Sequence, residues 1–399
     1  MAEAKPFKVS IDEAILQSTK QKLESARYPE EVELPDDERY SYGTPGSEVK
    51  RLVEYWKTSF NWRSVESRIN ELPQFTADVH VAGQESINVH FVHKRSTRPD
   101  AVPFLFIHGW PGNFLEVEKI LPLLTEPKDP SQQAFHVIAP SLPGFVFSSA
   151  PKQPGFDLYK IGATLNQLMV DLGYKSYVAQ GGDWGSMICR VLALEHTSNC
   201  RAIHVNMFPT PPSSLLNPIE AARFVLGGYN KREIADLQDT LQFVATGTGY
   251  SAIHDTKPHT LNFGLVDSPV GMLAWIREKL EAWTDNYAWE DEEIITWVFL
   301  YYATGKAATH IYKESKETNK RILESYISLP VGISLFPKEI YKMPRAWARR
   351  WAHVVTFDTH DKGGHFAATE TPEVLVDDFR RFYAKLQTSA AFRDVFKSG

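Results

Sequence analysis

The sequence predicts an α/β fold in which a mostly parallel central sheet carries helices on both faces. From residue 102 onward, short apolar segments rich in β-branched and aromatic residues alternate with segments of helical periodicity. Between residues 208 and 329 this alternation stops, and the pattern becomes mainly helical. We therefore expect a helical lid inserted between two late strands, and a further helical extension at the N-terminus.

Residues 1–75 are predicted to form the N-terminal extension, packed on the core. Ser10 and Glu13 have the spacing of a capping box, which predicts a helix that runs to about Arg27. The segments "GSEVKRLVEYWKTSF" and "WRSVESRINEL" predict two more helices. After them, "QFTADVHV" and "INVHFVHKR" alternate in polarity on either side of Gly83, which predicts a β-hairpin.

The α/β core is assigned to residues 76–208 and 329–399. After the hairpin, six short apolar segments are predicted to be its strands, with helices between several of them. In chain order they are "VPFLFI", "AFHVIAP", "SYVAQ", "AIHVNMF", "PVGISLF" and "AHVVTFD".

The helical lid is assigned to residues 209–328. One of its helices is predicted to begin with Asp267 or Ser268 as N-cap and with Pro269 in the first turn. The lid is rich in tyrosine and tryptophan. Because ligands of open α/β sheets bind outside the carboxyl ends of the strands, we expect the lid to cover a hydrophobic pocket there.

Composition excludes several classes of partner. The formal net charge is −6 and no block of lysine and arginine stands out, which argues against a nucleic-acid partner. Cys189 and Cys200 are the only cysteines, and the charged N-terminus does not resemble a secretory leader. No later window of about 18 residues is apolar throughout. We expect a cytoplasmic protein without disulfides or a membrane partner.

The segment "SYVAQGGDWGSMICRVLALEH" places Asp183 at a sharp turn between a predicted strand and a predicted helix. Gly181 and Gly185 flank it with the spacing of a nucleophile elbow, whereas helix capping is the alternative role of such an aspartate. A carboxylate is ionised at neutral pH and can attack an sp³ carbon without a base. The ester formed must then be hydrolysed, which requires a base and an oxyanion hole.

Two further motifs supply these groups. "FIHGWPGNFLE" follows a predicted strand and resembles the H-G-x-P oxyanion loop of α/β-hydrolases. The backbone N–H groups of Trp110 and Trp184 are the predicted oxyanion donors, and His108 is expected to be structural. "HDKGGHFAATETPEVL" places His365 on a glycine-flanked loop after the last predicted strand. His365 is the predicted general base, with His360 as its rival.

Six motifs in this order closely resemble the microsomal-type epoxide hydrolase family: "HGWPG", "GGDWGS", "DSPVG", "IYKES", "LFPKE" and "GGHFAATE". The resemblance covers nearly the whole chain and is nearest to the soluble fungal members. It implies an α/β-hydrolase fold and the hydrolysis of an epoxide to a vicinal diol, without a metal or an organic cofactor. The thirteen histidines also lack metal-ligand spacing.

The resemblance implies that Glu339, in "SLFPKE", is the acid that orients His365. Without the family, Glu339 would be interpreted as a solvated side chain after a proline. Asp358 and Asp361 are the alternative acids.

The resemblance further implies that two lid tyrosines donate hydrogen bonds to the epoxide oxygen. The matching positions are Tyr250 in "TGTGYSAIH" and Tyr312 in "HIYKES". Ring opening creates an alkoxide, and a neutral phenol is a suitable donor. Tyr301 and Tyr302 are the alternatives to Tyr312.

Two local features accompany these assignments. The family implies an often cis bond between Trp110 and Pro111. Val146, in "PGFVFSS", stands where many relatives have a smaller residue, which predicts a narrower pocket.

The resulting hypothesis is a two-step hydrolysis of a small hydrophobic aryl or alkyl epoxide through an ester on Asp183. A haloalkane dehalogenase with the same elbow is one alternative, but a halide leaving group would not need the tyrosine pair. A receptor that retains the fold without catalysis is another, but such proteins usually lose a catalytic residue. The N-terminal helices and the lid each offer a surface for a homodimer, and a role in detoxification or in metabolite synthesis is equally open.

Overall fold

The computed structural model describes residues 3–211 and 217–396. Within these ranges the chain forms one sheet of nine strands in the order β1-β2-β3-β5-β4-β6-β7-β8-β9. The pairs from β5 through β9 are parallel, whereas β1, β2 and β3 pair antiparallel with their neighbours. The strands are β1 Lys5–Pro6, β2 Gln74–Val79, β3 Ile87–Lys94, β4 Val102–Ile107, β5 Phe135–Pro140, β6 Tyr177–Gly181, β7 Cys200–Val205, β8 Ile327–Leu335 and β9 Ala352–Thr359.

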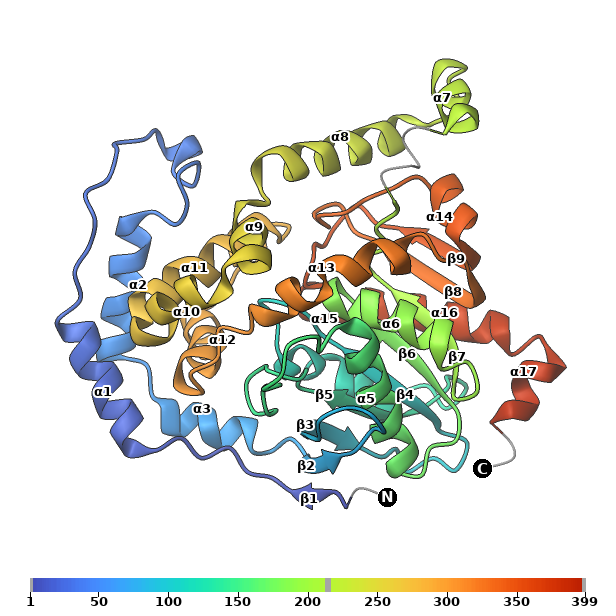
Figure 1. Cartoon of the computed structure of the whole chain (residues 1–399), viewed down its shortest axis with the longest axis horizontal. Helices are drawn as coiled ribbons and strands as arrows, with labels where there is room; N and C mark the ends of the chain where they lie inside the picture. The colour runs from blue at the N-terminus through green and yellow to red at the C-terminus, as the bar shows by residue number, and fades with distance from the viewer. Residues whose placement is uncertain (1–2, 212–216, 397–399) are drawn as a thin grey trace.

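Helices cover both faces of this sheet and extend beyond its edge (Figure 1). The helices that precede β7 are α1 Glu13–Glu24, α2 Gly46–Thr58, α3 Trp62–Ile69, α4 Ile120–Thr125, α5 Leu158–Asp171 and α6 Asp183–Glu195. Those between β7 and β8 are α7 Pro218–Val225, α8 Lys231–Thr246, α9 Gly249–Thr256, α10 Pro258–Asp267, α11 Pro269–Ala282, α12 Asp291–Ala303 and α13 His310–Leu323. The last are α14 Arg345–Trp351, α15 Ala367–Glu370, α16 Pro372–Leu386 and α17 Ala390–Val395; short 3₁₀ turns occupy Asp36–Glu38 and Phe114–Val117.

The predicted α/β fold is confirmed. The central strands β5, β4, β6 and β7 are almost entirely buried, because α5 and α6 pack together on one face and α4 and α16 pack together on the other. Strands enclosed in this way need apolar side chains on both faces, which explains their continuous rather than alternating hydrophobicity. The parallel strands share one carboxyl edge, and the loops that leave it carry the candidate site.

The N-terminal extension differs from the prediction at its start. Asp12, not Ser10, caps α1, since its carboxylate accepts a hydrogen bond from the Ala14 N–H at 2.9 Å. Ser10 lies in an extended segment whose neighbours Val9 and Ile11 donate their N–H groups to side chains of α3 and the residue after it. The helix also ends before Arg27. The capping-box prediction is therefore wrong by two residues.

Strand β1 was not predicted. Lys5 and Pro6 pair with β2, and the Phe7 N–H donates to the carbonyl of Gln74 at 2.8 Å. Two residues are too few for a recognisable β pattern, and proline is tolerated because this is an edge strand. The N-terminal extension is thus joined to the sheet as well as packed on it.

The helices α7 to α13 lie in the segment predicted as a lid. In α11 the choice left open by the sequence is resolved, because the Ser268 hydroxyl accepts from the Gly271 N–H at 2.9 Å and Pro269 occupies the first turn. The domain boundaries themselves stay predictions. Residues 1–2, 212–216 and 397–399 of the predicted domains lie outside the described residues. No helix of the described residues is long and apolar enough to cross a membrane.

Candidate active site

Asp183 begins α6 directly after β6 and has a positive φ of 47°. Such a backbone angle is unfavourable for any residue other than glycine and marks a constrained turn. The turn is close to β4: a Cβ atom on Gly185 would lie 2.0 Å from the carbonyl oxygen of Ile107. A Cβ on Gly181 would lie 2.5 Å from the backbone of Gly185. Glycine is therefore required on both sides, and the arrangement has the geometry of a nucleophile elbow.

The carboxylate of Asp183 faces the loop after β4. Its Oδ1 accepts a hydrogen bond from the backbone N–H of Trp110 at 2.8 Å. Gly109 allows this approach, since a Cβ there would lie 2.1 Å from the same oxygen. The Trp110–Pro111 peptide bond is cis. The loop is tied to the lid as well, because the Trp110 indole donates to the carbonyl of Ala307 at 3.0 Å.

His365 lies between two carboxylates. Its Nδ1 is 2.8 Å from Glu339 Oε1, and its Nε2 is 3.3 Å from Asp183 Oδ2. Both His365 and Glu339 are buried. Burial lowers the pKa of His365, but the charges of Glu339 and Asp183 outweigh it and hold that pKa well above its ordinary value. The structure thus aligns the predicted nucleophile, base and acid in one chain of contacts.

The alternative residues lie elsewhere. His360 Nε2 is 2.5 Å from Asp378, and its ring stacks on Phe336. Asp361 is exposed and pairs with Arg232 at 2.9 Å. Asp358 lies 3.7 Å from Arg381. None of these three has a described contact with Asp183, so the geometry favours His365 and Glu339.

His108 has the structural contacts that the sequence predicted. Burial lowers its pKa to about 4, so the ring is neutral. Its Nδ1 lies 3.0 Å from the Gly109 carbonyl, and its Nε2 accepts from the Leu142 N–H at 3.2 Å. It holds the loop after β4 against the loop after β5.

Tyr250 and Tyr312 come from lid helices α9 and α13 and meet above Asp183. Their ring centroids are 5.8 Å apart, and Tyr250 stacks on Trp110 at 5.2 Å, whereas Tyr312 meets Trp184 edge-on at 4.8 Å. The two hydroxyls lie close to each other, and the Tyr312 hydroxyl also lies beside Trp184. Burial, with the charge of Asp183 adding to it, raises the pKa of both phenols well above 10, so both are neutral donors.

The alternative tyrosines do not reach this position. The Tyr301 hydroxyl donates to the carbonyl of Gly112, beneath the oxyanion loop. Tyr302 lies beside Lys22 of the N-terminal extension. Both belong to α12 and help to hold the lid in place.

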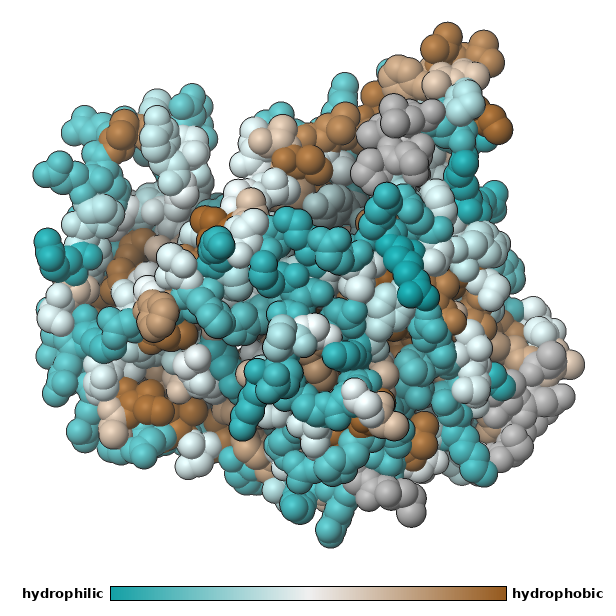
Figure 2. All heavy atoms as spheres, viewed as in Figure 1, coloured by the Kyte–Doolittle hydropathy of each residue, from teal (hydrophilic) through white to brown (hydrophobic). Residues whose placement is uncertain are grey.

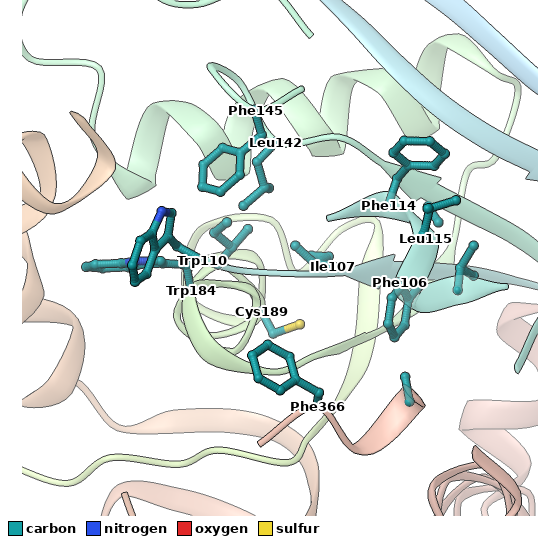
Figure 3. Packing of buried hydrophobic residues seen from close by; sticks show 14 of the residues in the cluster. Phe106, Ile107, Trp110, Phe114, Leu115, Leu142, Phe145, Trp184, Cys189 and Phe366 are labelled. Atoms are coloured by element: carbon teal, nitrogen blue, oxygen red, sulfur yellow. The ribbon is translucent and has the colours of Figure 1, made fainter. Parts of the chain in front are cut away.

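Apolar packing surrounds the polar groups of the site (Figure 3). The indoles of Trp110 and Trp184 lie together, with Phe145 and Leu142 on one side and Phe366 on the other. Val146, in the loop after β5, is fully buried with a positive φ of 39°. A site so enclosed has a low effective dielectric, which strengthens every charge interaction within it.

Three buried groups near the site received no role from the sequence. Glu116 lines the same small pocket as Asp183 and His365, and burial raises its pKa to about 8. The Lys279 ammonium lies 4.3 Å over the ring of Tyr250, and burial lowers its pKa. His254 packs edge-on against Trp110 and Tyr312. Glu116 alone stood within a recognised motif, eight residues after His108; nothing in the sequence placed the other two.

Comparison with known proteins shows the family of this chain. Residues 4–117 match the family described as "Epoxide hydrolase N terminus", and residues 102–250 match the "alpha/beta hydrolase fold" family. The pig protein "Epoxide hydrolase 1" is 32% identical over 419 residues, covering 96% of this chain and 89% of the pig protein. The chain belongs to the epoxide hydrolase family.

Solved structures of epoxide hydrolases share the whole architecture. The Aspergillus niger epoxide hydrolase is 34% identical with a TM-score of 0.84, covering 96% of each chain. The juvenile hormone epoxide hydrolase of the silkworm Bombyx mori is 27% identical with a TM-score of 0.89, covering 99% of this chain and 96% of the silkworm chain. The resemblance inferred from six motifs is thus confirmed, and the dehalogenase and receptor alternatives lose their support.

Proposed function

We propose that this epoxide hydrolase acts in two steps through an ester on Asp183. In the first step an Asp183 carboxylate oxygen attacks an epoxide carbon from the side opposite the C–O bond that breaks. Tyr250 and Tyr312 donate hydrogen bonds to the departing oxygen, which takes a proton from one of the two phenols and becomes a hydroxyl. The product is a hydroxyalkyl ester of Asp183.

In the second step His365, oriented by Glu339, removes a proton from a water molecule that attacks the ester carbonyl. The backbone N–H groups of Trp110 and Trp184 stabilise the tetrahedral oxyanion, and each donor in such sites contributes on the order of 3 kcal/mol. Collapse of the intermediate releases the vicinal diol and restores the Asp183 carboxylate. The Trp110 N–H supports this assignment because it already binds Asp183 Oδ1.

The observation that carries the proposal is the position of His365 between Glu339 and Asp183. Two carboxylates favour the charged imidazolium while Asp183 is free. Formation of the ester removes the negative charge of Asp183, and this lowers the pKa of His365. The imidazolium then returns a proton to the phenolate that ring opening leaves, and His365 becomes the base that the second step needs.

The substrate we propose is a small hydrophobic aryl or alkyl epoxide. Tryptophan, tyrosine and phenylalanine rings enclose the nucleophile, and few polar groups remain to bind a polar substituent.

The test is the intact mass of a His365→Gln variant after mixing with styrene oxide, followed by peptide mapping. The variant should gain one epoxide mass on the peptide that carries Asp183, because alkylation proceeds while hydrolysis stalls. Asp183→Asn is the matched control and should gain nothing at first. A folded His365→Gln variant without an adduct, from a parent that makes no diol, would contradict the proposal. An adduct on another peptide would contradict the role of Asp183.

A further inference from the structure

We propose that α7 and α14 together form a docking surface for an anionic lipid bilayer. The first observation is an exposed apolar group at the end of α7. The exposed fractions are 66% for Ile219, 58% for Phe224, 82% for Val225 and 83% for Leu226. Figure 2 shows hydrophobic atoms gathered at the tip of the molecule where Figure 1 places α7. Contiguous large apolar side chains on a surface usually mark a contact with another apolar phase.

This apolar tip is fixed to the protein rather than free. The indole of Trp347, in α14, donates a hydrogen bond to the Tyr229 hydroxyl at 2.7 Å. Tyr229 in turn donates to the carboxylate of Glu220 in α7. All three side chains are buried, and Phe224 packs near the ring of Tyr229. Trp347 and Tyr229 therefore join α14 to α7, and Figure 1 places both helices at the same end of the molecule.

The outer face of α14 is cationic. Its sequence, "RAWARRW", buries Trp347 and exposes Arg345, Arg349 and Arg350. Within the described parts of the chain, none of the three arginines pairs with a carboxylate. The protein as a whole carries a formal charge of −6, so this is a local concentration of positive charge. Exposed apolar residues and arginines without a carboxylate partner, at one end of a protein, are the combination that binds at the interface of an anionic bilayer.

The same charge disfavours a second copy of this chain as the occupant. A twofold dimer would place the patch against itself, because an isologous interface uses the same surface on both subunits. The like charges of Arg345, Arg349 and Arg350 from both copies would then gather at one interface, which disfavours association. A bilayer instead offers phosphate groups to the guanidinium groups and acyl chains to Phe224 and Leu226. This inference is independent of the proposed catalytic roles, which concern residues beneath the lid.

Cosedimentation with vesicles tests the surface. The full chain is mixed with vesicles of phosphatidylcholine alone or with phosphatidylserine added, and binding is expected only to the anionic vesicles. The variant Arg345→Gln/Arg349→Gln/Arg350→Gln should bind about 100-fold more weakly, because each cation near such a surface contributes roughly fivefold. The variant Phe224→Ser/Val225→Ser/Leu226→Ser should lose binding. Both variants should hydrolyse a water-soluble epoxide at the native rate, which shows that they are folded.

The matched control removes three exposed lysines elsewhere, Lys20→Gln/Lys128→Gln/Lys175→Gln. It has the same net charge as the arginine variant and should bind the vesicles like the native chain. If the lysine variant binds the vesicles as weakly as the arginine variant does, the net charge of the protein and not the patch decides the binding, and the proposal fails. It also fails if the native chain ignores anionic vesicles. A native dimer that the apolar variant converts to a monomer, without vesicle binding, would assign the patch to self-association.

Discussion

Tyr250 and Tyr312 converge on Asp183 from separate lid helices, so each is expected to carry part of one task. We predict that Tyr250→Phe and Tyr312→Phe each slow ester formation at least tenfold, and that the double variant slows it by a further factor of ten or more. Ester hydrolysis should change little, because neither phenol contacts the His365–Glu339 pair. Stopped-flow fluorescence can follow ester formation through the adjacent Trp110 and Trp184. Equal slowing of both steps would contradict the assignment, and Tyr302→Phe is the matched control.

Glu116 makes stability depend on pH. Burial raises its pKa to about 8 in the folded chain, so the folded state binds the proton more tightly than the unfolded state does. Its stabilising effect is complete below the unfolded pKa of about 4.5 and is lost as the pH rises through about 8. We predict that Glu116→Gln, which mimics the protonated acid, gains on the order of 3 kcal/mol over the native chain at pH 7 and nothing at pH 4.

Urea unfolding at several pH values measures this difference. The other raised carboxyl, Glu370, has a pKa of about 7 and is present in both proteins, so its contribution cancels. If the free energy of unfolding varied with pH in the same way for the two proteins, the prediction would be wrong, because Glu116 would then ionise in the folded state at no cost in stability.

At the scale of single residues, the sequence alone predicts those site residues whose neighbours in the chain form a recognisable motif. Asp183 and Trp110 are marked by glycines that their own turns require, and His365 by the glycines of its loop. Glu339 and the two tyrosines needed the family resemblance, because nothing in their immediate neighbours distinguishes them. Glu116, Lys279 and His254 were missed because their significance lies in burial beside groups distant in the chain.

Among the elements, α8 of the lid contacts the two loops that carry Glu339 and His365. The buried Lys342 ammonium lies 2.6 Å from Asp239 and 3.2 Å from Asp236, and the Thr240 hydroxyl exchanges hydrogen bonds with the backbone of Lys342. At the other end of α8, Arg232 donates to the carbonyl of His360. Glu339 precedes Lys342 by three residues, so α8 holds the acid loop in place.

We predict that Lys342→Met slows ester hydrolysis more than ester formation. It removes the nearer of the two cations beside the buried carboxylate of Asp236, since only Arg232 remains, at 3.8 Å, and breaking such a buried pair costs on the order of 3 kcal/mol of stability. The loop that carries Lys342 and Glu339 is then no longer held by α8, so Glu339 is no longer fixed. The contacts that hold Asp183, Tyr250 and Tyr312 are unchanged. Single-turnover kinetics resolve the two steps. Asp239→Asn is the milder control, since its side chain is 65% exposed. Equal slowing of both steps would mean that α8 only stabilises the fold.

The sequence predicts the existence and order of the elements better than their contacts. Asn230 and Glu233 form a capping box at the start of α8, a signal that a short window contains. Its docking on the loop at Lys342, a hundred residues later, has no such signal. Strand β1 and the four-residue helix α15 are too short for any periodicity. Ser10 satisfied the capping pattern, but tertiary contacts of Val9 and Ile11 hold the chain around it outside the helix. Helix α1 therefore begins two residues later than predicted, with Asp12 as its N-cap.

Across the whole molecule, the N-terminal extension links the edge of the sheet to the lid. Polar contacts join it to α10, α11 and α12, among them Lys22 with Asp267, Thr44 with Ala274, Glu48 with Arg277, and Arg51 with Asp291. Exposed ion pairs contribute about 0–1 kcal/mol each. The buried aromatic contact between Trp62 and Phe299, with centroids 4.7 Å apart, is therefore expected to dominate.

We predict that Trp62→Ala lowers the free energy of unfolding by about 3–5 kcal/mol, the range for a large aromatic removed from a core. Because Trp62 lies in the extension and Phe299 in the lid, the lid should loosen as well. Limited proteolysis between α7 and α13 should accelerate, and urea unfolding should remain a single transition at a lower midpoint. Arg51→Gln, which removes a half-exposed cation shared by Glu48 and Asp291 at the same interface, should lower the midpoint less than Trp62→Ala does. A second transition in the Trp62→Ala variant, with the core still folded, would instead mean that extension and lid form a unit that unfolds apart from the sheet.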